Sequence, residues 1–353
     1  MSGHVLIARL DNAGDVLLAG PAIRAVAARA SRVTLLVGPR GLEAAALLPG
    51  VDAITVYRAP WIDPQPEPVD PEHTRAFVDR LTDLAIDEAL IFTSFHQSAL
   101  PLALLLRLAG VPTIAAISED YPGSLLDVRH RVSDDCHEVE RTLSLVATLG
   151  YTLPAGDDGR LRVRRRGIRR PGLAPWAGAV VVHPGSSVPA RAWEPGRNAE
   201  LVDALVAAGY RVVVTGGPGE RTLTARVAGA PRPQVRDLGG RLSFAELGDL
   251  LADARALIAG NTGPAHLASA VGTPVVSLFP PTVPAVRWRP WRVPHRLLGD
   301  QAIACAGCRC RVCPIPGQPC LASISVGDVL EALSSLLAAD PSADQVRPCC
   351  ATA

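Results

Sequence analysis

The sequence contains no lysine, so all 35 of its cationic side chains are arginines. A GC-rich coding sequence is the simplest explanation of this bias. Its chemical consequence holds whatever the cause, because mechanisms that need a lysine Schiff base or a lysine general base are excluded. Any side-chain cation that clamps a phosphate group in this protein must therefore be a guanidinium.

An excess of charge of either sign is also missing. The formal net charge is +1 at pH 7, which gives no general attraction to nucleic acid or to anionic lipid. We therefore expect no nucleic-acid partner. One local exception is a basic segment with seven arginines between positions 160 and 170. It could contact anionic lipid or an acidic acceptor, but a solvated connection between domains is the favoured interpretation.

A long uninterrupted apolar segment is missing too. The most apolar region, residues 99–117, contains Arg107, Pro101 and Pro112, and it predicts a buried helix followed by a strand. Residues 1–8 are too few and too uncharged for a signal peptide. We expect a soluble, cytoplasmic and monomeric protein, with peripheral contact to the inner face of the membrane left open.

The sequence is rich instead in short apolar runs that alternate with alanine- and leucine-rich helical stretches. The predicted strands are 5–8, 33–37, 53–57, 88–92, 113–117, 179–182, 211–215, 235–238, 256–259 and 275–279. The predicted helices are 16–30, 41–48, 72–84, 98–109, 137–149, 197–208, 220–228, 244–254 and 263–271. Such alternation is typical of parallel sheets with helices on both faces.

The length of 353 residues allows two domains, each with its own core. The alternation fails after Gly150 and restarts near residue 179. We therefore predict an N-terminal domain over 1–156, a connection over 157–175 and a C-terminal domain over 176–353.

Polar residues gather in three loops, each of which follows a predicted buried strand. The loops are Arg9-Leu-Asp-Asn-Ala-Gly-Asp15, His183-Pro-Gly-Ser-Ser187 continuing to Arg191-Ala-Trp193, and Gly260-Asn-Thr-Gly-Pro-Ala-His266. Ligands of open α/β sheets bind at such strand ends, where helix N-termini present free N–H groups. A carboxylate in the first loop, with hydroxyls and a cation in the second, indicates an enzyme that handles a nucleotide-linked group.

These motifs resemble those of glycosyltransferase family 9, the family of the bacterial lipopolysaccharide heptosyltransferases. The matching patterns are Arg9-x-Asp-x-x-Gly-Asp15-Val-Leu-Leu-x-x-Pro21, His183-Pro-Gly-x-Ser187-x-x-x-Arg191-x-Trp193 and Asn261-Thr-Gly-Pro-x-His266-Leu-Ala. The resemblance implies the α/β GT-B fold, in which two Rossmann-like domains with parallel sheets face a central cleft. It implies an acceptor on the N-terminal domain, a nucleotide-sugar donor on the C-terminal one, and a C-terminal helix that can pack back on the N-terminal domain.

The resemblance also implies transfer of a sugar with inversion and without a metal ion, most simply of heptose from ADP-heptose. Such transfer needs a carboxylate that takes the proton of the acceptor hydroxyl. Asp15 fits this role as catalytic base, although an Asp before a helix can also be an ordinary N-cap. Asp11 is interpreted as a turn former or an acceptor contact, and His96 as an acceptor contact or a loop histidine.

The leaving diphosphate is expected to be stabilised by Arg191 with the hydroxyls of Ser186 and Ser187. Relatives commonly carry lysine at the position of Arg191, and the alternative for this loop is a simple Pro-Gly turn. The other expected donor contacts are Glu220, Leu242, Asn261, Thr262, Gly263 and His266. Two of them have a structural alternative, because Glu220 could be an acid in the first turn of a helix and His266 a helix-packing residue.

Five cysteines crowd into sixteen residues: Cys305, Cys308, Cys310, Cys313 and Cys320. Cys-x₂-Cys pairs suit a structural zinc ion, but two such pairs are usually farther apart. Reduced thiols, a structural zinc and disulfides are the three interpretations, in that order of preference. No cofactor is expected to be required.

Two other functions are compatible with the sequence. One is a nucleotide-sugar epimerase of the same fold, and the other is a non-catalytic nucleotide-sugar-binding protein. The Gly-Asp turn, with Asp15 and Arg191 both present, favours the transferase. Acceptor contacts are expected from the loops at 59–71, 94–97 and 118–131 of the N-terminal domain.

Overall fold

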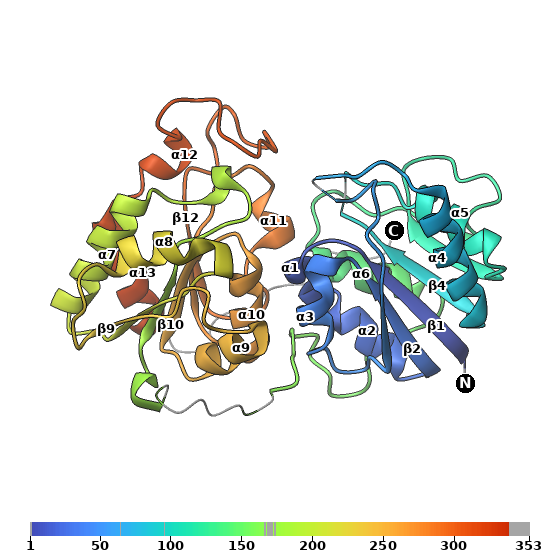
Figure 1. The fold of residues 1–353 in the computed structure, drawn as a ribbon, viewed down its shortest axis with the longest axis horizontal. Coiled ribbons are helices and arrows are strands. Elements are labelled where there is room, and N and C mark those ends of the chain that lie inside the picture. Colours follow the sequence, from blue (N-terminus) through green and yellow to red (C-terminus); the bar gives the residue numbers. More distant parts are fainter. Residues whose placement is uncertain are drawn as a thin grey trace. The chain divides into compact units, whose positions relative to one another are not determined.

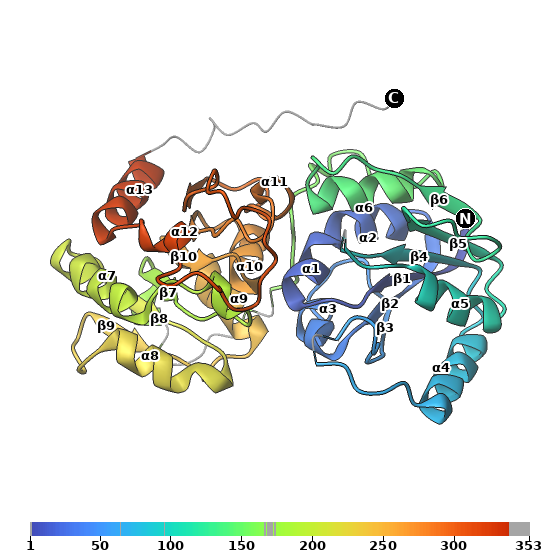
Figure 2. The same ribbon diagram turned by 90° about the horizontal axis from the view of Figure 1, so that it is seen from above.

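The computed structural model describes residues 2–63, 65–94, 96–165, 167, 172 and 174–338. They form two compact units, and the division falls between Arg164 and Arg165. Each unit holds one six-stranded parallel sheet with helices on both of its faces (Figures 1 and 2).

The sheet of the first unit has the strand order β3-β2-β1-β4-β5-β6. Its strands are β1 (Ser2–Arg9), β2 (Ala30–Val37), β3 (Ala53–Val56), β4 (Glu88–Phe92), β5 (Thr113–Ile117) and β6 (Val128–His130). Its helices are α1 (Ala13–Leu18), α2 (Gly20–Ala27), α3 (Leu42–Ala45), α4 (Pro71–Asp83), α5 (Leu100–Leu108) and α6 (Glu138–Ala147). Helices α4 and α5 cover the face that carries Leu6 and Ala8, while α2 and α6 pack together on the other. Strand β1 is therefore buried on both faces.

The sheet of the second unit has the strand order β12-β11-β10-β7-β8-β9. Its strands are β7 (Val180–His183), β8 (Val212–Val214), β9 (Val235–Asp237), β10 (Ala256–Gly260), β11 (Val275–Leu278) and β12 (His295–Leu298). Its helices are α7 (Pro195–Ala207), α8 (Arg221–Ala228), α9 (Phe244–Ala252), α10 (Gly263–Val271), α11 (Ala285–Trp288), α12 (Pro319–Ala322) and α13 (Val326–Ala338). Helices α7, α8 and α13 share one apolar core with Val180 and Val182.

The two sheets have the same topology. Numbered within its own unit, each runs 3-2-1-4-5-6, so the strand order reverses between β1 and β4 and again between β7 and β10. In an open α/β sheet, ligands bind beyond the carboxyl ends of the strands at this reversal. The loops after these four strands are therefore the places where a functional site is expected.

The helix predicted over 16–30 is two helices. Pro21 lies in the first turn of α2 and has no N–H, so it cannot continue the hydrogen bonds of α1. The predicted capping box at the start of α9 is confirmed, since Ser243 and Glu246 exchange hydrogen bonds of 3.3 and 2.8 Å. Helix α10 ends as predicted, with Gly272 in the left-handed conformation.

Helix α13 packs on α7, β11 and β12 of its own unit. Val329 and Leu333 complete the apolar core on that face of the second sheet. The expectation that the C-terminal helix can also pack back on the N-terminal domain stays a prediction. Residues 339–353, with Cys349 and Cys350, lie outside the described residues.

The predicted connection at 157–175 begins on the surface of the first unit. The carboxylate of Asp157 receives two hydrogen bonds from Arg24, at 2.7 and 2.9 Å, and these bonds lower the pKa of Asp157 to about 2. The backbone N–H of Arg164 donates to the carbonyl of Leu47 at 2.7 Å. Residues 157–164 are therefore packed against their unit, while the predicted domain boundaries stay a prediction.

The described arginines of this basic segment make contacts inside the chain. Arg160 and Arg162 pair with Asp158 at 3.2 and 3.0 Å, and Arg165 pairs with Asp249 at 3.3 Å. Arg166, Arg169 and Arg170 lie outside the described residues. Among the helices that the structure describes, none combines the length and the apolar character needed to cross a membrane.

Candidate functional site

In the first unit, the polar residues beyond β1 and β4 are organised around Arg9. This last residue of β1 has a side chain that is 1% exposed, and three carboxylates surround it. Its Nε lies 2.9 Å from Asp11 Oδ2, its Nη2 lies 3.1 Å from Asp15 Oδ1, and its Nη1 lies 3.4 Å from Glu138 Oε2. We call these four residues the Arg9 cluster. Burial by itself would lower the pKa of Arg9, but the three carboxylates outweigh it and raise that pKa, so Arg9 stays charged.

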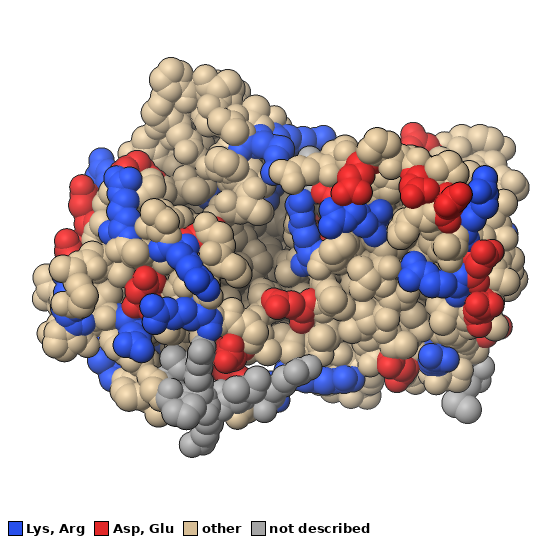
Figure 3. Space-filling model, viewed as in Figure 1, with Lys and Arg blue, Asp and Glu red and all other residues tan. Residues whose placement is uncertain are grey.

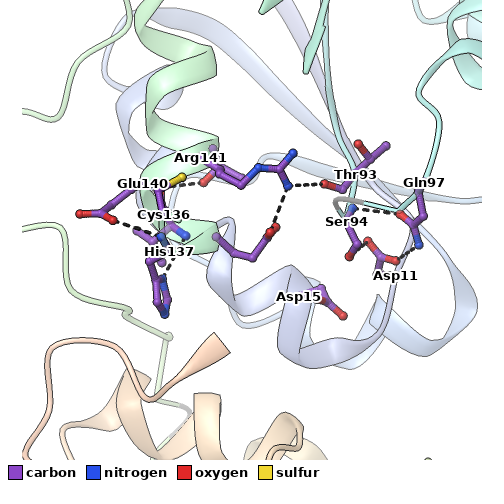
Figure 4. Close-up of polar contacts among 12 residues, drawn as sticks. Asp11, Asp15, Thr93, Ser94, Gln97, Cys136, His137, Glu140 and Arg141 are labelled. Carbon is purple, nitrogen blue, oxygen red and sulfur yellow. Dashed lines mark hydrogen bonds and ion pairs between the residues drawn. The ribbon is translucent and has the colours of Figure 1, made fainter. Parts of the chain in front are cut away.

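Helix α6 brings Glu138 to this cluster, although the residue is far from Arg9 in the sequence. His137 caps the helix: its side chain accepts from the N–H of Val139, and its own N–H donates to Glu140. The cap places Glu138 in the first turn, where it also receives a 3.0 Å bond from Arg141. Figure 4 shows Arg141 extending from α6 to the carbonyl of Thr93, the residue that follows β4.

The carboxylate of Asp11 contacts Arg9 through one oxygen and Gln97 through the other. The side-chain amide of Gln97 donates to its carboxylate (Figure 4), and the N–H of Ser94 in turn donates to Gln97 at 3.0 Å. Burial, aided by the neighbouring charges of Asp15 and Glu138, raises the pKa of Asp11 to about 6, although Arg9 and Gln97 oppose the shift. Asp11 is therefore a buried acid that titrates near the neutral range.

Asp15 is the most exposed carboxylate of the Arg9 cluster. Its side chain is 17% exposed, against 7% for Asp11 and 1% for Glu138. The N-cap of α1 is Asn12 and Asp15 lies inside the first turn, so the N-cap interpretation of Asp15 is wrong. The cluster therefore presents one carboxylate toward solvent and holds it with a buried cation.

In the second unit, the loop after β7 folds against the end of β10. The hydroxyl of Ser186 accepts from the N–H of Val188 at 3.2 Å, and residues Pro189–Arg191 form a 3₁₀ turn. A Cβ atom at Gly260 would lie only 2.7 Å from the carbonyl oxygen of Arg191. Glycine thus allows the turn that carries Arg191 to lie against the end of β10, next to Asn261.

Glu220 lies over Gly185 of the same loop. A Cβ atom at Gly185 would come within 2.0 Å of the Glu220 carboxylate, which also accepts from the N–H of Gly217 at 2.7 Å. His183, the last residue of β7, has its Nε2 3.9 Å from Glu220. Burial lowers the pKa of His183 and Glu220 only partly offsets this, so the imidazole is neutral near pH 7. The expected contact of Glu220 with a ribose stays a prediction.

The start of α10 completes this edge of the second sheet. Asn261 and His266 are buried. Thr262 is the N-cap residue, but its hydroxyl bonds to the carbonyl of Gly260 and does not cap the helix. Pro264 has no N–H, and the N–H of Ala265 donates to the carbonyl of Thr262 at 3.0 Å. Gly263 is therefore the residue of the first turn whose N–H is left for a ligand, at the positive end of the helix dipole.

The structure brings most of the predicted site residues together within their own units. Asp11 and Asp15 share Arg9, and the predicted donor residues of the loops after β7, β8 and β10 lie at the reversal of the second sheet. Leu242 lies elsewhere, because it precedes α9 in the loop after the edge strand β9. His96 is exposed in the loop after β4, between Ser94 and Gln97.

Sequence reasoning missed several members of this arrangement. The sequence motif that contains Arg9 does not indicate that the Arg9 side chain binds three carboxylates. Ser94 and Gln97 were predicted only as part of a loop that contacts the acceptor, and their contacts with Asp11 were not predicted. The polar residues directly after β4 were a usable signal, because the loop after β1 has the same polar character. Glu138 had no such signal, since it lies 129 residues from Arg9 and only the fold joins them.

The described cysteines are not joined by disulfide bonds: Cys136, Cys305, Cys308, Cys310, Cys313 and Cys320. Within the described part of the chain, no three His, Cys, Asp or Glu side chains are gathered closely enough to hold a metal ion as they stand.

On the face shown in Figure 3, basic and acidic side chains are interspersed over both units.

Comparison with known sequences points to one family. A family model described as glycosyltransferase family 9 (heptosyltransferase) matches residues 83–318. Lipopolysaccharide heptosyltransferase 3 of Escherichia coli K12 is 34% identical over 165 residues, which are 44% of this chain and 47% of that protein. Lipopolysaccharide heptosyltransferase 1 of Pseudomonas aeruginosa is 32% identical over 250 residues, 68% of this chain and 66% of that protein. The chain thus spans less than half of the first of these relatives.

Solved structures show the same fold. The glycosyltransferase family 9 protein of Veillonella parvula superposes with a TM-score of 0.72 at 16% identity, over 95% of this chain and 97% of that one. Heptosyltransferase WaaC of E. coli, solved with ADP, gives 0.71 at 20% identity, over 94% and 99% of the two chains. Together with the two parallel sheets, this likeness confirms the α/β GT-B fold expected from the sequence.

Proposed function

Since the chain belongs to glycosyltransferase family 9, we propose that it is an inverting glycosyltransferase. It moves a sugar from a nucleotide-sugar donor to a hydroxyl of a glycan or small-molecule acceptor. Heptose from ADP-heptose is the expected donor, because the relatives are named heptosyltransferases and WaaC was solved with ADP. The observation that carries the proposal is one solvent-facing carboxylate beyond β1, together with hydroxyl, guanidinium and helix N-terminal groups beyond β7 and β10.

Asp15 is assigned as the catalytic base. Inverting transfer needs a carboxylate that removes the proton of the acceptor hydroxyl while that oxygen attacks the anomeric carbon. Arg9 binds Oδ1 of Asp15 at 3.1 Å and so fixes the orientation of the carboxylate. Oδ2 is the oxygen that we assign to the proton transfer.

The leaving diphosphate is assigned to Arg191, the hydroxyls of Ser186 and Ser187, and the N-terminus of α10. Negative charge grows on the bridging phosphate oxygen as the sugar bond breaks, and preorganised cations and N–H groups stabilise that charge. The side chain of Thr262 does not cap α10, so the N–H of Gly263 can bind an anion at that end. A guanidinium in this place supplies charge without a divalent ion, so the transfer is proposed to be metal-independent.

The rest of the donor is assigned to the remaining residues of the second unit. Glu220 accepts hydrogen bonds from the ribose hydroxyls, Asn261 and His266 face the sugar and the phosphates, and Leu242 contacts the nucleoside. The proposal for Glu220 is consistent with its place over Gly185, at the loop that carries the serines.

The acceptor is assigned to the first unit, with Asp11 and His96 as candidate contacts. Lipopolysaccharide core is the expected class, since the curated relatives are named for it, and a small-molecule hydroxyl is the alternative. The protein is proposed to work as a monomer in the cytoplasm, with peripheral contact to the inner membrane face. Light scattering of the purified chain tests the monomer.

The test is incubation of the full chain with ADP-heptose, with and without lipopolysaccharide-core acceptors. We expect ADP release that depends on the acceptor and a product one heptose larger. Isomerisation of the donor without acceptor would instead identify an epimerase. Donor binding with neither reaction, across an acceptor panel that includes small molecules, would indicate a binding protein.

A further inference from the structure

Three cysteines of the loop between β12 and α12 line one pocket together with Cys320 of α12. The pocket is lined by Cys305, Cys308, Cys313 and Cys320, together with Ala190, Pro281, Thr282 and Pro319. We call it the thiol pocket. The sequence spacing argued against a metal site because the second cysteine pair follows the first so closely. The structure removes that objection, because the fourth cysteine of the pocket is Cys320, which is buried in α12 and lies farther along the chain than the two close pairs.

The backbone of this loop is shaped by bonds to the segment after β11. The N–H of Gly307 donates to the carbonyl of Pro281 at 2.6 Å, and the N–H of Arg309 donates to that of Thr282 at 2.9 Å. Gly307 has a φ of 77°, which favours glycine at this turn. The turn between Cys305 and Cys308 is therefore set by the backbone itself. In Figure 3, the prominence at the top of the second unit, where this loop lies in Figure 1, is largely without charged side chains.

The chemistry of the lining is that of a soft-metal ligand set. Four cysteine side chains line one small pocket, and thiolate sulfur is the ligand that Zn²⁺ takes in structural sites.

We propose that the thiol pocket binds one thiolate-coordinated metal ion, most simply Zn²⁺, through Cys305, Cys308, Cys313 and Cys320. The four thiols each lose a proton to solvent, and their sulfur atoms move in to about 2.3 Å from the ion. Such closure is needed because the described side chains are not gathered at bonding distance. It is common for a metal site to be completed only when the ion binds.

The same pocket is joined to the turn that carries Arg191. Ala190 lines the pocket, its N–H donates to the carbonyl of Arg311 at 2.9 Å, and its carbonyl accepts from Gln318 at 2.7 Å. Arg311 also donates to the carbonyl of Ser187 at 3.4 Å. A bound ion would thus fix the loop that holds Ser187 and Arg191. This second step rests on the proposed transfer reaction, whereas metal binding itself does not.

The test begins with the full chain purified without added metal. Elemental analysis should find about one zinc per chain, and an equal content of iron would support the same site with another ion. Cys308→Ser and Cys313→Ser should each lose most of the metal. Cys310→Ser is the matched control, because Cys310 is a thiol of the same loop that does not line the pocket, and it should keep the ion.

A second measurement covers variants that fold poorly. Wild-type protein stripped with a mercurial reagent, which is then removed with excess thiol, should bind added Zn²⁺ with a rise in melting temperature and with loss of four titratable thiols. Absence of metal after purification, together with no response of the stripped protein to Zn²⁺, would overturn the site. If the protein proves not to be a transferase, these readouts still decide the metal. If it is one, loss of the ion should lower kcat more than it raises the donor KM, and unchanged kcat would reject the link to Arg191.

Discussion

Asp15 is the residue on which the proposed chemistry depends most directly. Asp15→Asn should lower the transfer rate by about 10²–10⁴, the usual effect of removing a general base. Donor affinity should stay nearly intact, because the carboxylate acts on the acceptor hydroxyl. Measuring kcat and the donor Kd tests this, with Glu43→Gln, an exposed acid of the same unit, as control. Turnover within a factor of about three of wild type would reject Asp15 as the base.

Arg191 should act mainly in the transition state. Arg191→Ala is expected to lower kcat more than it raises the donor KM, with a loss of about 3 kcal/mol, or roughly a hundredfold. Arg191→Lys should recover much of the rate, since the charge returns and only the bidentate geometry is lost. Arg197→Ala, in an exposed first turn of α7, is the control. A change confined to KM would mean that Arg191 only binds the donor.

Asp11 should leave a signature in the pH dependence of stability. Its pKa rises to about 6 in the folded state, mainly because of burial, so the folded protein binds a proton more tightly than the unfolded chain. Stability therefore falls as the pH rises from about 4 to 6, and Asp11→Asn should remove that fall. Urea unfolding at a series of pH values measures it.

Asp157 serves as a control for that experiment, because its pKa is shifted in the opposite direction. Arg24 holds the pKa of Asp157 at about 2, so its contribution is present above the unfolded pKa and is lost as the pH falls from about 4 to 2. Asp157→Asn should change the acid side only. An unchanged profile between pH 4 and 6 in Asp11→Asn would contradict the role of burial at Asp11.

At the scale of elements, the end of β10 controls the place of the turn at 189–191. In Gly260→Ala the new methyl group would meet the carbonyl oxygen of Arg191 at 2.7 Å, so the turn must shift. We expect transfer to fall about tenfold or more, since small displacements of catalytic groups are costly. Gly219→Ala is the matched control, because a methyl group there meets nothing within 4 Å. Equal activity of the two variants in kcat/KM assays would show that the close approach is unimportant.

The sequence predicted those elements whose limits are marked by a change of residue type. Strands β4 and β5 and helix α10 have the predicted bounds, because each is a clear apolar run or begins and ends at glycine. Strands β6 and β12 were missed, since these edge strands contain His and Arg and are only half buried. The loops of the candidate site were found because they follow apolar strands, whereas the pairing of Arg9 with Glu138 exists only in the folded chain.

At the scale of the whole molecule, the proposed chemistry should survive the removal of free divalent ions. Arg191 and the N-terminus of α10 take the place of such an ion at the diphosphate, so EDTA should leave the transfer rate unchanged. The assay compares ADP release with EDTA, with Mg²⁺ and with neither. Loss of transfer in EDTA that Mg²⁺ restores would refute the metal-independent mechanism. Loss that only Zn²⁺ restores would instead report on the thiol pocket.

Each unit has its own sheet and its own apolar core, and the two sheets share one strand order. Such an arrangement is what duplication of an ancestral gene segment would leave after the two copies diverged beyond recognition in sequence. Its consequence is evolutionary independence: mutations that change the loops of one copy need not disturb the core of the other. Under the proposed division of labour, a lineage can acquire a new acceptor while inheriting its donor unaltered, and the joint at Arg164–Arg165 is where recombination could exchange whole halves between relatives.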